Sequence, residues 1–300
     1  MRLPGLEDAA VNADTRRPLA VDLFCGLGGW TEGLLAEGYR VVGFDIERHR
    51  YPKLVSHGSE SVKRPGLNWS DQSKRGSRDA QFNRPPDVDL SAGWQEYPSQ
   101  LILQDVLTLH GSQFRDAALI VASPPCQAYS YMAMPWKRGK AMAAAIRDDQ
   151  SGRKLDALNA LFNACFRIQR EASEAAGHHI PMVIENVKGA QPWVGRAAWH
   201  YGSFYLWGDV PALMPTTFKV QKFNPDGTNH PQGSWFAIAD SKNRGAQGVK
   251  QHGHSGRRWF ADPDVAGHLS SHSSAHKAAS AQIARIPLDL ARWVARVYRP

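Results

Sequence analysis

The segment from Leu19 to Asp45 constrains the fold of this chain most. Leu19-Ala20-Val21-Asp22-Leu23-Phe24 has the composition of a buried strand, and Gly26-Leu27-Gly28-Gly29 follows it. A helix is predicted after these glycines; Gly38 ends it, and residues 40–44 form a second strand that ends at Asp45. A strand, a glycine turn, a helix and a strand with an acid at its tip make one half of a nucleotide-binding α/β sheet.

The same alternation of strands and helices resumes after residue 98. Apolar runs predict strands at residues 101–103, 117–121, 182–184 and 203–206. A helix is predicted from Arg153 to Ala176, because Leu155, Leu158, Leu161, Phe162, Cys165 and Ile168 share one face. The predicted fold class is therefore α/β, with a Rossmann-like sheet.

Changes of composition predict the domain boundaries. Residues 1–17 are polar and are expected to form a flexible arm, and residues 18–215 form the sheet domain. Residues 48–98 are rich in Ser, Arg, Asn and Pro and are interpreted as a long insertion in that domain. Residues 216–277 predict a small irregular second domain. Residues 278–300 are expected to supply a helix that packs back on the first domain.

Charge and cysteine usage narrow the class of protein. Lys and Arg number 36 against 28 Asp and Glu, which gives a formal net charge of +8 and favours polyanionic partners. No apolar run reaches the length of a membrane span, and a cytoplasmic protein is expected. Cys25, Cys126 and Cys165 are an odd number without metal-ligand spacing, so the pattern indicates a free reactive thiol rather than a disulfide framework.

The glycine turn and Asp45 are the first candidate site. Glycines at the carboxyl end of a strand let the backbone approach a ligand, and an acid about twenty residues later is placed to accept ribose hydroxyls. A dehydrogenase could carry the same elements, so this turn alone does not identify which cofactor binds.

Cys126 and Glu185 are more informative. Cys126 follows Pro124-Pro125 at the tip of a predicted strand, and its thiol is expected at the ligand edge of the sheet. Cys165 fits a buried position on an apolar helix face instead. Glu185 follows the run 182–184, so it is expected to share the edge with Cys126 and Asp45.

These motifs together resemble the DNA cytosine-5 methyltransferase family. The resemblance rests on residues 22–29, on Pro-Cys-Gln at 125–127 and on Glu-Asn-Val at 185–187, and it covers about residues 19–210. It implies catalytic roles for Cys126, Glu185, Gln127 and Arg196. It implies S-adenosylmethionine contacts from Phe24, Gly26, Leu27, Gly29, Asp45, Ile46, Asp105, Val106 and Pro125.

The resemblance also implies a reaction. The Cys126 thiolate adds to C6 of a cytosine that has been flipped out of duplex DNA, and Glu185 supplies a proton at N3. C5 then accepts the methyl group, and S-adenosylhomocysteine is released; no metal is needed. Double-stranded DNA is the expected partner of a monomer, with residues 216–277 reading the target; whether a cognate restriction endonuclease is a further partner stays open from the sequence.

Two features depart from the family or add to it. The usual Gln-x-Arg-x-Arg motif is missing after Glu-Asn-Val, and Arg196 is the only arginine nearby. The loop 130–152 is interpreted as a moving lid, with Lys137, Arg138, Lys140 and Arg147 suited to phosphates.

Several alternatives stay open from the sequence. An RNA cytosine-5 methyltransferase would use similar chemistry, a dehydrogenase would leave Cys126 and Glu185 without a role, and the missing arginine motif permits a catalytically impaired or altered-donor DNA-binding homologue. His268, His272 and His276 have helical spacing, but the serines between them make a poor helix and no cysteine is near, so a metal site is not predicted.

Overall fold

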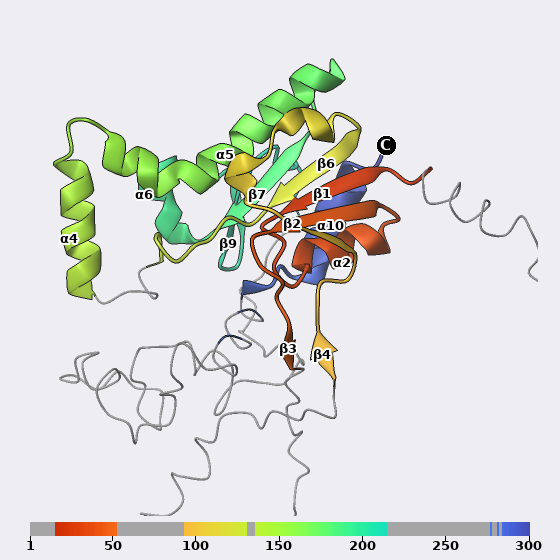
Figure 1. Cartoon of the computed structure of the whole chain (residues 1–300), viewed down its shortest axis with the longest axis horizontal. Coiled ribbons are helices and arrows are strands. Elements are labelled where there is room, and N and C mark those ends of the chain that lie inside the picture. Colours follow the sequence, from red (N-terminus) through yellow and green to blue (C-terminus); the bar gives the residue numbers. More distant parts are fainter. Residues whose placement is uncertain (1–15, 53–92, 131–135, 215–276, 278–280, 282–283) are drawn as a thin grey trace, which may run out of the picture. The chain divides into compact units, whose positions relative to one another are not determined.

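The computed structural model describes residues 16–52, 93–130, 136–214, 277, 281 and 284–300 (Figure 1). The chain divides into two compact units. The first consists of residues 1–49, 96–219 and 285–300, and the second of residues 50–95 and 220–284. The predicted second domain, 216–277, lies almost entirely outside the described residues, as do His268, His272 and His276.

A seven-stranded sheet organises the first unit, with the strand order β5-β2-β1-β6-β7-β9-β8. Five strands are parallel: β1 (Leu19–Leu23), β2 (Arg40–Asp45), β5 (Gln100–Leu103), β6 (Ala117–Ala122) and β7 (Met182–Asn186). β9 (Phe204–Gly208) runs antiparallel to β7, and β8 (Trp199–Tyr201) runs antiparallel to β9. The strand order reverses at β1 and β6, which is where open α/β sheets bind ligands.

The central strands are apolar throughout because both faces of the sheet are covered. Along β6, Ile120 and Ala122 enter one buried cluster, while Leu119 and Val121 enter the other. The long helix α5 (Arg153–Ala176) covers the first face, together with the short helices η3 (Val106–Thr108) and η4 (Gly111–Phe114). Helices α2 (Gly29–Ala36) and α10 (Leu288–Val297) cover the second face (Figure 1).

Small residues let α10 lie directly on α2. A side chain at Gly33 would overlap Ala291, and Leu290, Ala291, Val294 and Ala295 are fully buried. Arg292 and Arg296 pair with Glu37 at 2.6 and 2.9 Å. The C-terminal helix therefore completes the core over the first strands.

The remaining elements are short or lie outside the sheet. They are β3 (Tyr51–Pro52) and β4 (Trp94–Gln95), which pair antiparallel, α4 (Trp136–Arg147), η5 (Lys188–Ala190) and α6 (Gln191–Val194). In the part of the chain that the structure describes, no helix combines the length and the apolar character that a membrane span requires.

The structure confirms the predicted α/β class and the helix 153–176, and it corrects three local predictions. The segment 130–152 contains helix α4, because its run of alanines has high helix propensity. The predicted helix 278–297 is interrupted at residues 285–287, and α10 begins after this break, at Leu288, with Pro287 as its N-cap. The insertion 48–98 is not irregular throughout, since β3 and β4 pair within it.

Candidate active site

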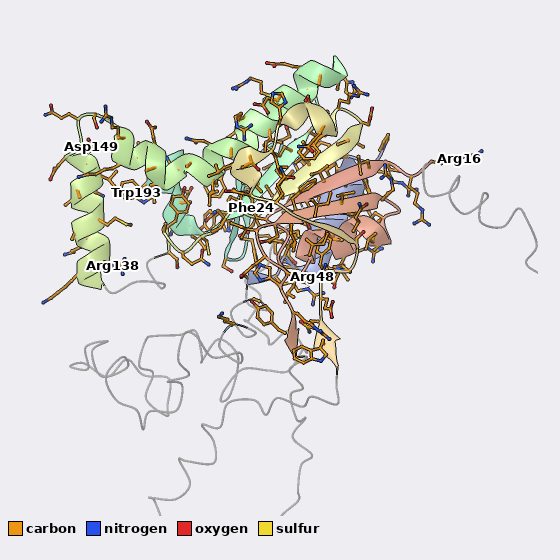
Figure 2. All side chains as sticks on the ribbon, viewed as in Figure 1. Arg16, Phe24, Arg48, Arg138, Asp149 and Trp193 are labelled. Carbon is orange, nitrogen blue, oxygen red and sulfur yellow. The ribbon has the colours of Figure 1, made fainter. Side chains whose placement is uncertain are left out.

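The candidate residues lie along one edge of the sheet. Because β1, β2, β5, β6 and β7 are parallel, their carboxyl ends all point the same way. The glycine turn follows β1, Asp45 ends β2, and Asp105 follows β5. Cys126 follows β6, and Glu185 lies at the end of β7. Figure 2 labels Phe24, which follows β1 at this edge. The fold thus places the predicted cofactor and catalytic segments on neighbouring strands.

The glycine turn has a left-handed backbone, and its glycines have different neighbours. Phe24, Gly26 and Gly28 have φ angles of 56°, 51° and 80°. A Cβ atom on Gly28 would overlap Pro98, and one on Gly29 would overlap the backbone of Ile286. A Cβ atom on Gly26 would meet nothing within 4 Å. Gly26 therefore borders open space, whereas Gly28 and Gly29 are required by packing inside the protein.

Asp45 is held against the turn as a carboxylate. Its Oδ2 accepts a hydrogen bond from the Gly26 amide at 2.9 Å, and its Oδ1 accepts one from the Ile46 amide at 2.8 Å. His49 lies 3.5 Å from the same carboxylate. Burial alone would raise the pKa of Asp45, but the bonds from His49 and Gly26 outweigh it and lower that pKa. Asp45 is therefore an ionised acceptor at the tip of β2.

Exposed apolar side chains lie beside Asp45. β2 and β5 are neighbours, with Asp45 opposite Leu103. Three apolar side chains here are exposed: Ile46 by 73%, Leu103 by 53% and Leu107 by 48%. Ile46 follows β2, Leu103 ends β5 and Leu107 lies in η3. Asp105 caps η3 by accepting a hydrogen bond from the Leu107 amide at 2.9 Å, and Val106 is buried. This edge therefore presents apolar surface next to polar acceptors.

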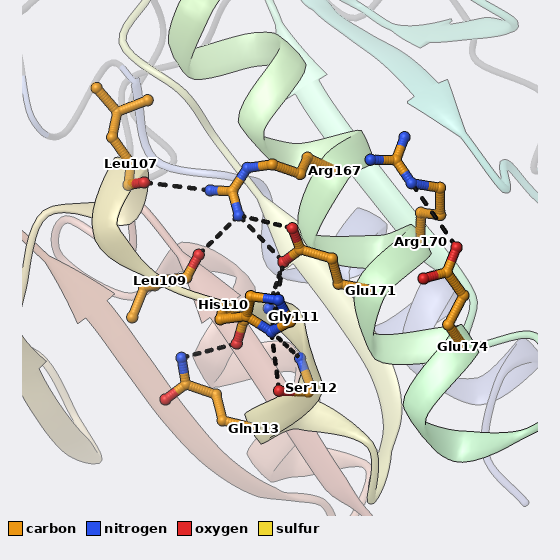
Figure 3. Close-up of polar contacts among 10 residues, drawn as sticks. All are labelled: Leu107, Leu109, His110, Gly111, Ser112, Gln113, Arg167, Arg170, Glu171 and Glu174. Carbon is orange, nitrogen blue, oxygen red and sulfur yellow. Dashed lines mark hydrogen bonds and ion pairs between the residues drawn. The ribbon is translucent and has the colours of Figure 1, made fainter.

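A polar network fixes the segment that carries Asp105 (Figure 3). Arg167 on α5 donates hydrogen bonds to the carbonyl oxygens of Leu109 at 2.8 Å and Leu107 at 3.3 Å. It also pairs with Glu171, which accepts a bond from the Gly111 amide at 2.6 Å. The carbonyls and amides at the ends of two short helices are thus satisfied by one ion pair.

A second buried network lies under the glycine turn. Thr31 on α2 donates to Asp22 at 2.6 Å, and its hydroxyl also lies 2.6 Å from the Tyr97 hydroxyl. Tyr97 packs on Gly43, where a side chain would overlap its ring. Burial raises the pKa of Asp22 to about 7. The end of the insertion is therefore built into the support of the turn.

Cys126 lies in a tight turn that is anchored on both sides. Its carbonyl oxygen accepts bonds from the Tyr129 and Ser130 amides at 3.0 and 2.9 Å. The Tyr129 hydroxyl donates to Asn159 on α5 at 3.0 Å. Upstream, the Pro124 carbonyl accepts a bond from Asn186 at 2.9 Å. The Glu-Asn-Val motif is thus hydrogen-bonded directly to the residue that precedes Pro-Cys-Gln.

The electrostatics of Cys126 and Glu185 are coupled. Burial raises the pKa of the Cys126 thiol to about 11, and the charge of Glu185 adds to this shift. Burial also raises the pKa of Glu185 to about 8, although a hydrogen bond from Ser123 opposes the rise. At neutral pH Glu185 is therefore a neutral carboxylic acid near a neutral thiol, and it is able to donate a proton.

Of the other predicted residues, some are exposed and some are buried. Pro125 and Gln127 are exposed beside Cys126, and Arg196 is exposed between α6 and β8. Lys137, Arg138 and Lys140 are exposed on α4, and Arg147 lies over the ring of Trp193 at 5.7 Å. Cys25 and Cys165 are buried free cysteines. Phe24 and Leu27 are partly and fully buried in the turn.

Sequence reasoning missed four residues that support this edge: Trp30, Tyr97, Ser123 and Asn186. Asn186 lies within Glu-Asn-Val and Ser123 lies two residues before Pro-Cys-Gln, so their closeness to these motifs could have indicated a supporting role. Tyr97 stands at the end of an irregular stretch, and Trp30 looked like an ordinary apolar helix residue. Their roles depend on contacts between segments that are far apart in the sequence.

Among the described residues, no group of three or more His, Cys, Asp or Glu side chains could hold a metal ion.

No family model and no curated protein matches this chain. Solved structures that it matches include a prophage-encoded DNA modification methyltransferase from E. coli, at 17% identity and a TM-score of 0.28, covering 58% of this chain. The Dnmt2 methyltransferase of S. pombe matches at 14% identity and a TM-score of 0.28. The Entamoeba histolytica methyltransferase EhMeth matches at 13% identity and a TM-score of 0.26. Each of these two matches covers 60% of this chain.

The matched regions span 33%, 37% and 41% of those three proteins. All three are methyltransferases by name. The resemblance to the cytosine-5 methyltransferases lies in the ordered motifs of this chain, at residues 22–29, 125–127 and 185–187.

Proposed function

We propose that this protein transfers a methyl group from S-adenosylmethionine to C5 of cytosine in DNA. The observation that carries the proposal is that Cys126 follows β6 and the buried Glu185 lies at the end of the neighbouring parallel strand β7, at the edge where Gly26 borders open space. Cysteine is a nucleophile and a carboxylic acid of raised pKa is a proton donor, so the two groups suit one reaction on one ring.

The residues at the edge fit the proposed cofactor. Gly26 leaves room for a ligand against the backbone, and Asp45 is an ionised acceptor for ribose hydroxyls. The exposed Ile46 and Leu107 offer apolar surface for a flat base, with Asp105 as a polar neighbour. Phe24, Leu27, Gly29, Val106 and Pro125 complete the proposed set. S-adenosylmethionine, when bound, would supply an electrophilic methyl group.

The side chains of this protein would then act on the base. The Cys126 sulfur forms a bond to C6, the electron pair displaced from the ring reaches N3, and Glu185 gives its proton to N3. This makes C5 nucleophilic enough to take the methyl group, and the bond from the methyl carbon to the sulfonium sulfur would break to leave S-adenosylhomocysteine. A base removes the C5 proton, the bond from sulfur to C6 breaks, and N3 returns its proton to Glu185. The thiol is neutral at rest, so ionisation must accompany substrate binding.

Duplex DNA is the proposed substrate, and its target cytosine must be flipped out of the stack. The net charge of +8 favours a polyanion, and the cations on α4 are suited to phosphates. Residues 216–277 are proposed to read the target sequence, and Arg196 and Gln127 are proposed to assist at the base. An RNA substrate is the second candidate, since Cys126 and Glu185 would serve the same chemistry there.

Covalent trapping tests the proposal directly. Purified protein is incubated with tritiated S-adenosylmethionine and with duplex DNA, transfer RNA or a duplex that contains 5-fluorocytosine. We expect transfer to DNA and a denaturation-resistant adduct with the fluorinated duplex. Cys126→Ser should abolish both, and Cys165→Ala, which removes a fully buried thiol on α5, should retain both.

The other outcomes separate the alternatives. Transfer to transfer RNA alone would move the assignment to RNA. DNA binding without transfer or adduct would indicate a catalytically impaired homologue. Transfer that survives Cys126→Ser would overturn the mechanism.

A further inference from the structure

The segment between β6 and Cys126 has few backbone groups that can hold it in place. Ser123 directly follows β6, and Pro124-Pro125 separates it from Cys126. Proline has no amide hydrogen, so Ser123 is the last residue ahead of Cys126 whose backbone can donate. The Ser123 amide donates to the Leu23 carbonyl of β1 at 3.1 Å. Backbone donation from this segment to the sheet therefore ends at Ser123.

Beyond that point, side chains from two other elements hold the segment. Trp30 on α2 donates from its indole Nε1 to Ser123 Oγ at 3.1 Å, and Asn186 on β7 donates to the Pro124 carbonyl at 2.9 Å. An indole nitrogen can only donate, so the direction of the first bond is fixed. Trp30 is 2% exposed and belongs to the buried cluster under α2 and α10, so the core sets its position.

The start of α2 links Trp30 to the glycine turn. Gly29, the first residue of α2, leaves no room for a side chain, and Thr31 donates to Asp22 on β1 at 2.6 Å. The first turn of the helix is therefore fixed on both sides of Trp30. A donor at this point of α2 relates the position of Ser123 to that of the turn.

We propose that Trp30 is a positioning residue that acts through Ser123 to hold the Cys126 loop, residues 123–130, in place relative to the glycine turn. The inference rests on the proposed function, in which the Cys126 sulfur must reach C6 while the methyl donor lies at the turn. Without the indole donor, the loop keeps its contact with Asn186 but is free to shift relative to α2. Such a shift leaves cofactor binding in place and lowers the fraction of molecules in which the sulfur is aligned with the base.

A purely structural role for the same hydrogen bond makes a different prediction. A buried indole N–H needs a partner in any protein, and a bond that only satisfies Trp30 contributes to stability alone. Its loss then leaves the reactivity of Cys126 in the folded protein unchanged. A positioning role predicts that the partly exposed Cys126 thiol becomes more accessible, while the buried Cys25 and Cys165 stay protected.

Alkylation of the cysteines tests the positioning role without any substrate. Each folded variant is treated with iodoacetamide, and peptide mass spectrometry follows the three cysteines separately. Trp30→Phe, which keeps an aromatic ring, and Ser123→Ala should each raise the alkylation rate of Cys126 about 3- to 10-fold, the effect of one hydrogen bond. The rates of Cys25 and Cys165 should not change.

Three further variants serve as controls. Ser123→Thr keeps the acceptor and should react like wild type. The double variant Trp30→Phe/Ser123→Ala should react no faster than either single variant, because Trp30 acts through Ser123. Trp293→Phe makes the same substitution on α10, where the indole donates to the Leu213 carbonyl at 3.1 Å, and should leave the Cys126 rate unchanged.

Methyl transfer gives the second readout. In single turnovers with duplex DNA, Trp30→Phe and Ser123→Ala should each be about 3- to 10-fold slower than wild type. Calorimetric titration should show that the dissociation constant for S-adenosylmethionine changes less than about twofold, since the removed bond lies between α2 and the loop. Faster alkylation of Cys126 together with slower transfer is the signature of a loop that has lost its position.

Several results would overturn the inference. They are an unchanged Cys126 alkylation rate in both single variants, equal acceleration of all three cysteines, multiplied effects in the double variant, and faster alkylation without slower transfer. If Trp30→Phe does not fold, Ser123→Ala decides alone, because it removes one oxygen atom and leaves no large cavity. A wild-type protein that transfers no methyl group refutes the proposed function, whereas the alkylation rates still decide whether Trp30 positions the Cys126 loop.

Discussion

At the scale of single residues, burial has set the chemistry of the edge. The pKa of Glu185 lies at about 8 instead of the usual 4.5, because its carboxyl group is shielded from water at the end of β7. Burial of this kind disfavours the charged form of the acid. The folded state is therefore destabilised at alkaline pH, where Glu185 must ionise.

Glu185→Gln should flatten the dependence of stability on pH. In wild type the folded state binds the Glu185 proton more tightly than the unfolded state, so stability is complete below about pH 4.5 and falls as pH rises to about 8. The loss is a few kcal/mol, at about 1.4 kcal/mol for each pH unit. Denaturant unfolding at pH 6 and pH 9 should show a smaller difference for Glu185→Gln. Asp22, whose pKa is about 7, contributes equally to the pH dependence of stability in wild type and in Glu185→Gln, so it does not affect the comparison. An identical difference would contradict the assigned burial.

In the glycine turn, Gly26 is a proposed ligand contact, whereas Gly28 is constrained by packing against Pro98. Gly26→Ala places its methyl group in open space, so it should weaken S-adenosylmethionine binding by more than tenfold while costing about 1 kcal/mol of stability for its positive φ. Gly28→Ala places its methyl group against Pro98 and should cost roughly 1–3 kcal/mol more. Calorimetric titration and thermal unfolding measure the two effects. A Gly26→Ala protein that binds the cofactor normally would place the ligand elsewhere.

At the scale of elements, α5 supports η3 by direct hydrogen bonds, although the two helices are far apart in the sequence. Arg167 holds two carbonyl oxygens of the segment that follows Asp105, and Glu171 holds the first amide of η4 (Figure 3). The proposed cofactor contacts at Asp105 and Val106 thus depend on a helix that is not itself among the proposed cofactor contacts.

Arg167→Leu should raise the KM for S-adenosylmethionine about 3- to 10-fold with a smaller change in kcat, because two backbone carbonyls lose their donor. Arg170→Leu is the matched control. Arg170 lies on the same helix and pairs only loosely with Glu174, at 3.9 Å, with both side chains largely exposed. Steady-state kinetics with varied cofactor compare the two. Equal effects from both variants would mean that charge on α5, rather than support of η3, is what matters.

At the scale of the whole molecule, the excess of positive charge is the property that bears on the partner. The chain has a formal net charge of +8, and α4 contributes exposed cations shortly after the loop that carries Cys126; Figure 2 labels Arg138 there. Cations that neutralise phosphates release counterions from DNA. The slope of log affinity against log salt concentration therefore reports the number of phosphates that the protein neutralises.

Lys137→Ala/Arg138→Ala should weaken binding to duplex DNA and lower the slope of log affinity against log salt by about 2. Arg115→Ala/Arg170→Ala removes the same charge from exposed positions elsewhere in the first unit and should leave the slope nearly unchanged. Fluorescence anisotropy at several salt concentrations measures both. Equal slopes for the two double variants would remove α4 from the proposed DNA contact.

The sequence by itself determined the layers of the fold and the order of the motifs along it. Apolar runs of strand length, glycine at the first turn and the periodicity of residues 153–176 are local signals, and they predicted β1, β2, β6, β7 and α5 because local propensity and burial agree there. Parallel strands then require Cys126 and Glu185 to share an edge. The alanine-rich helix α4 was overlooked although its signal was local.

Only the tertiary structure decided which side chains support the site. Tyr97 reaches Thr31 across 66 residues of chain, and Trp30 reaches Ser123 across 93. The different roles of Gly26 and Gly28 depend on Pro98, which no local pattern connects to the turn. Hydrogen bonds between distant segments form only when the chain is packed, and desolvation depends on everything that surrounds a group. The direction of the Glu185 shift was therefore a property of the fold and not of the motif.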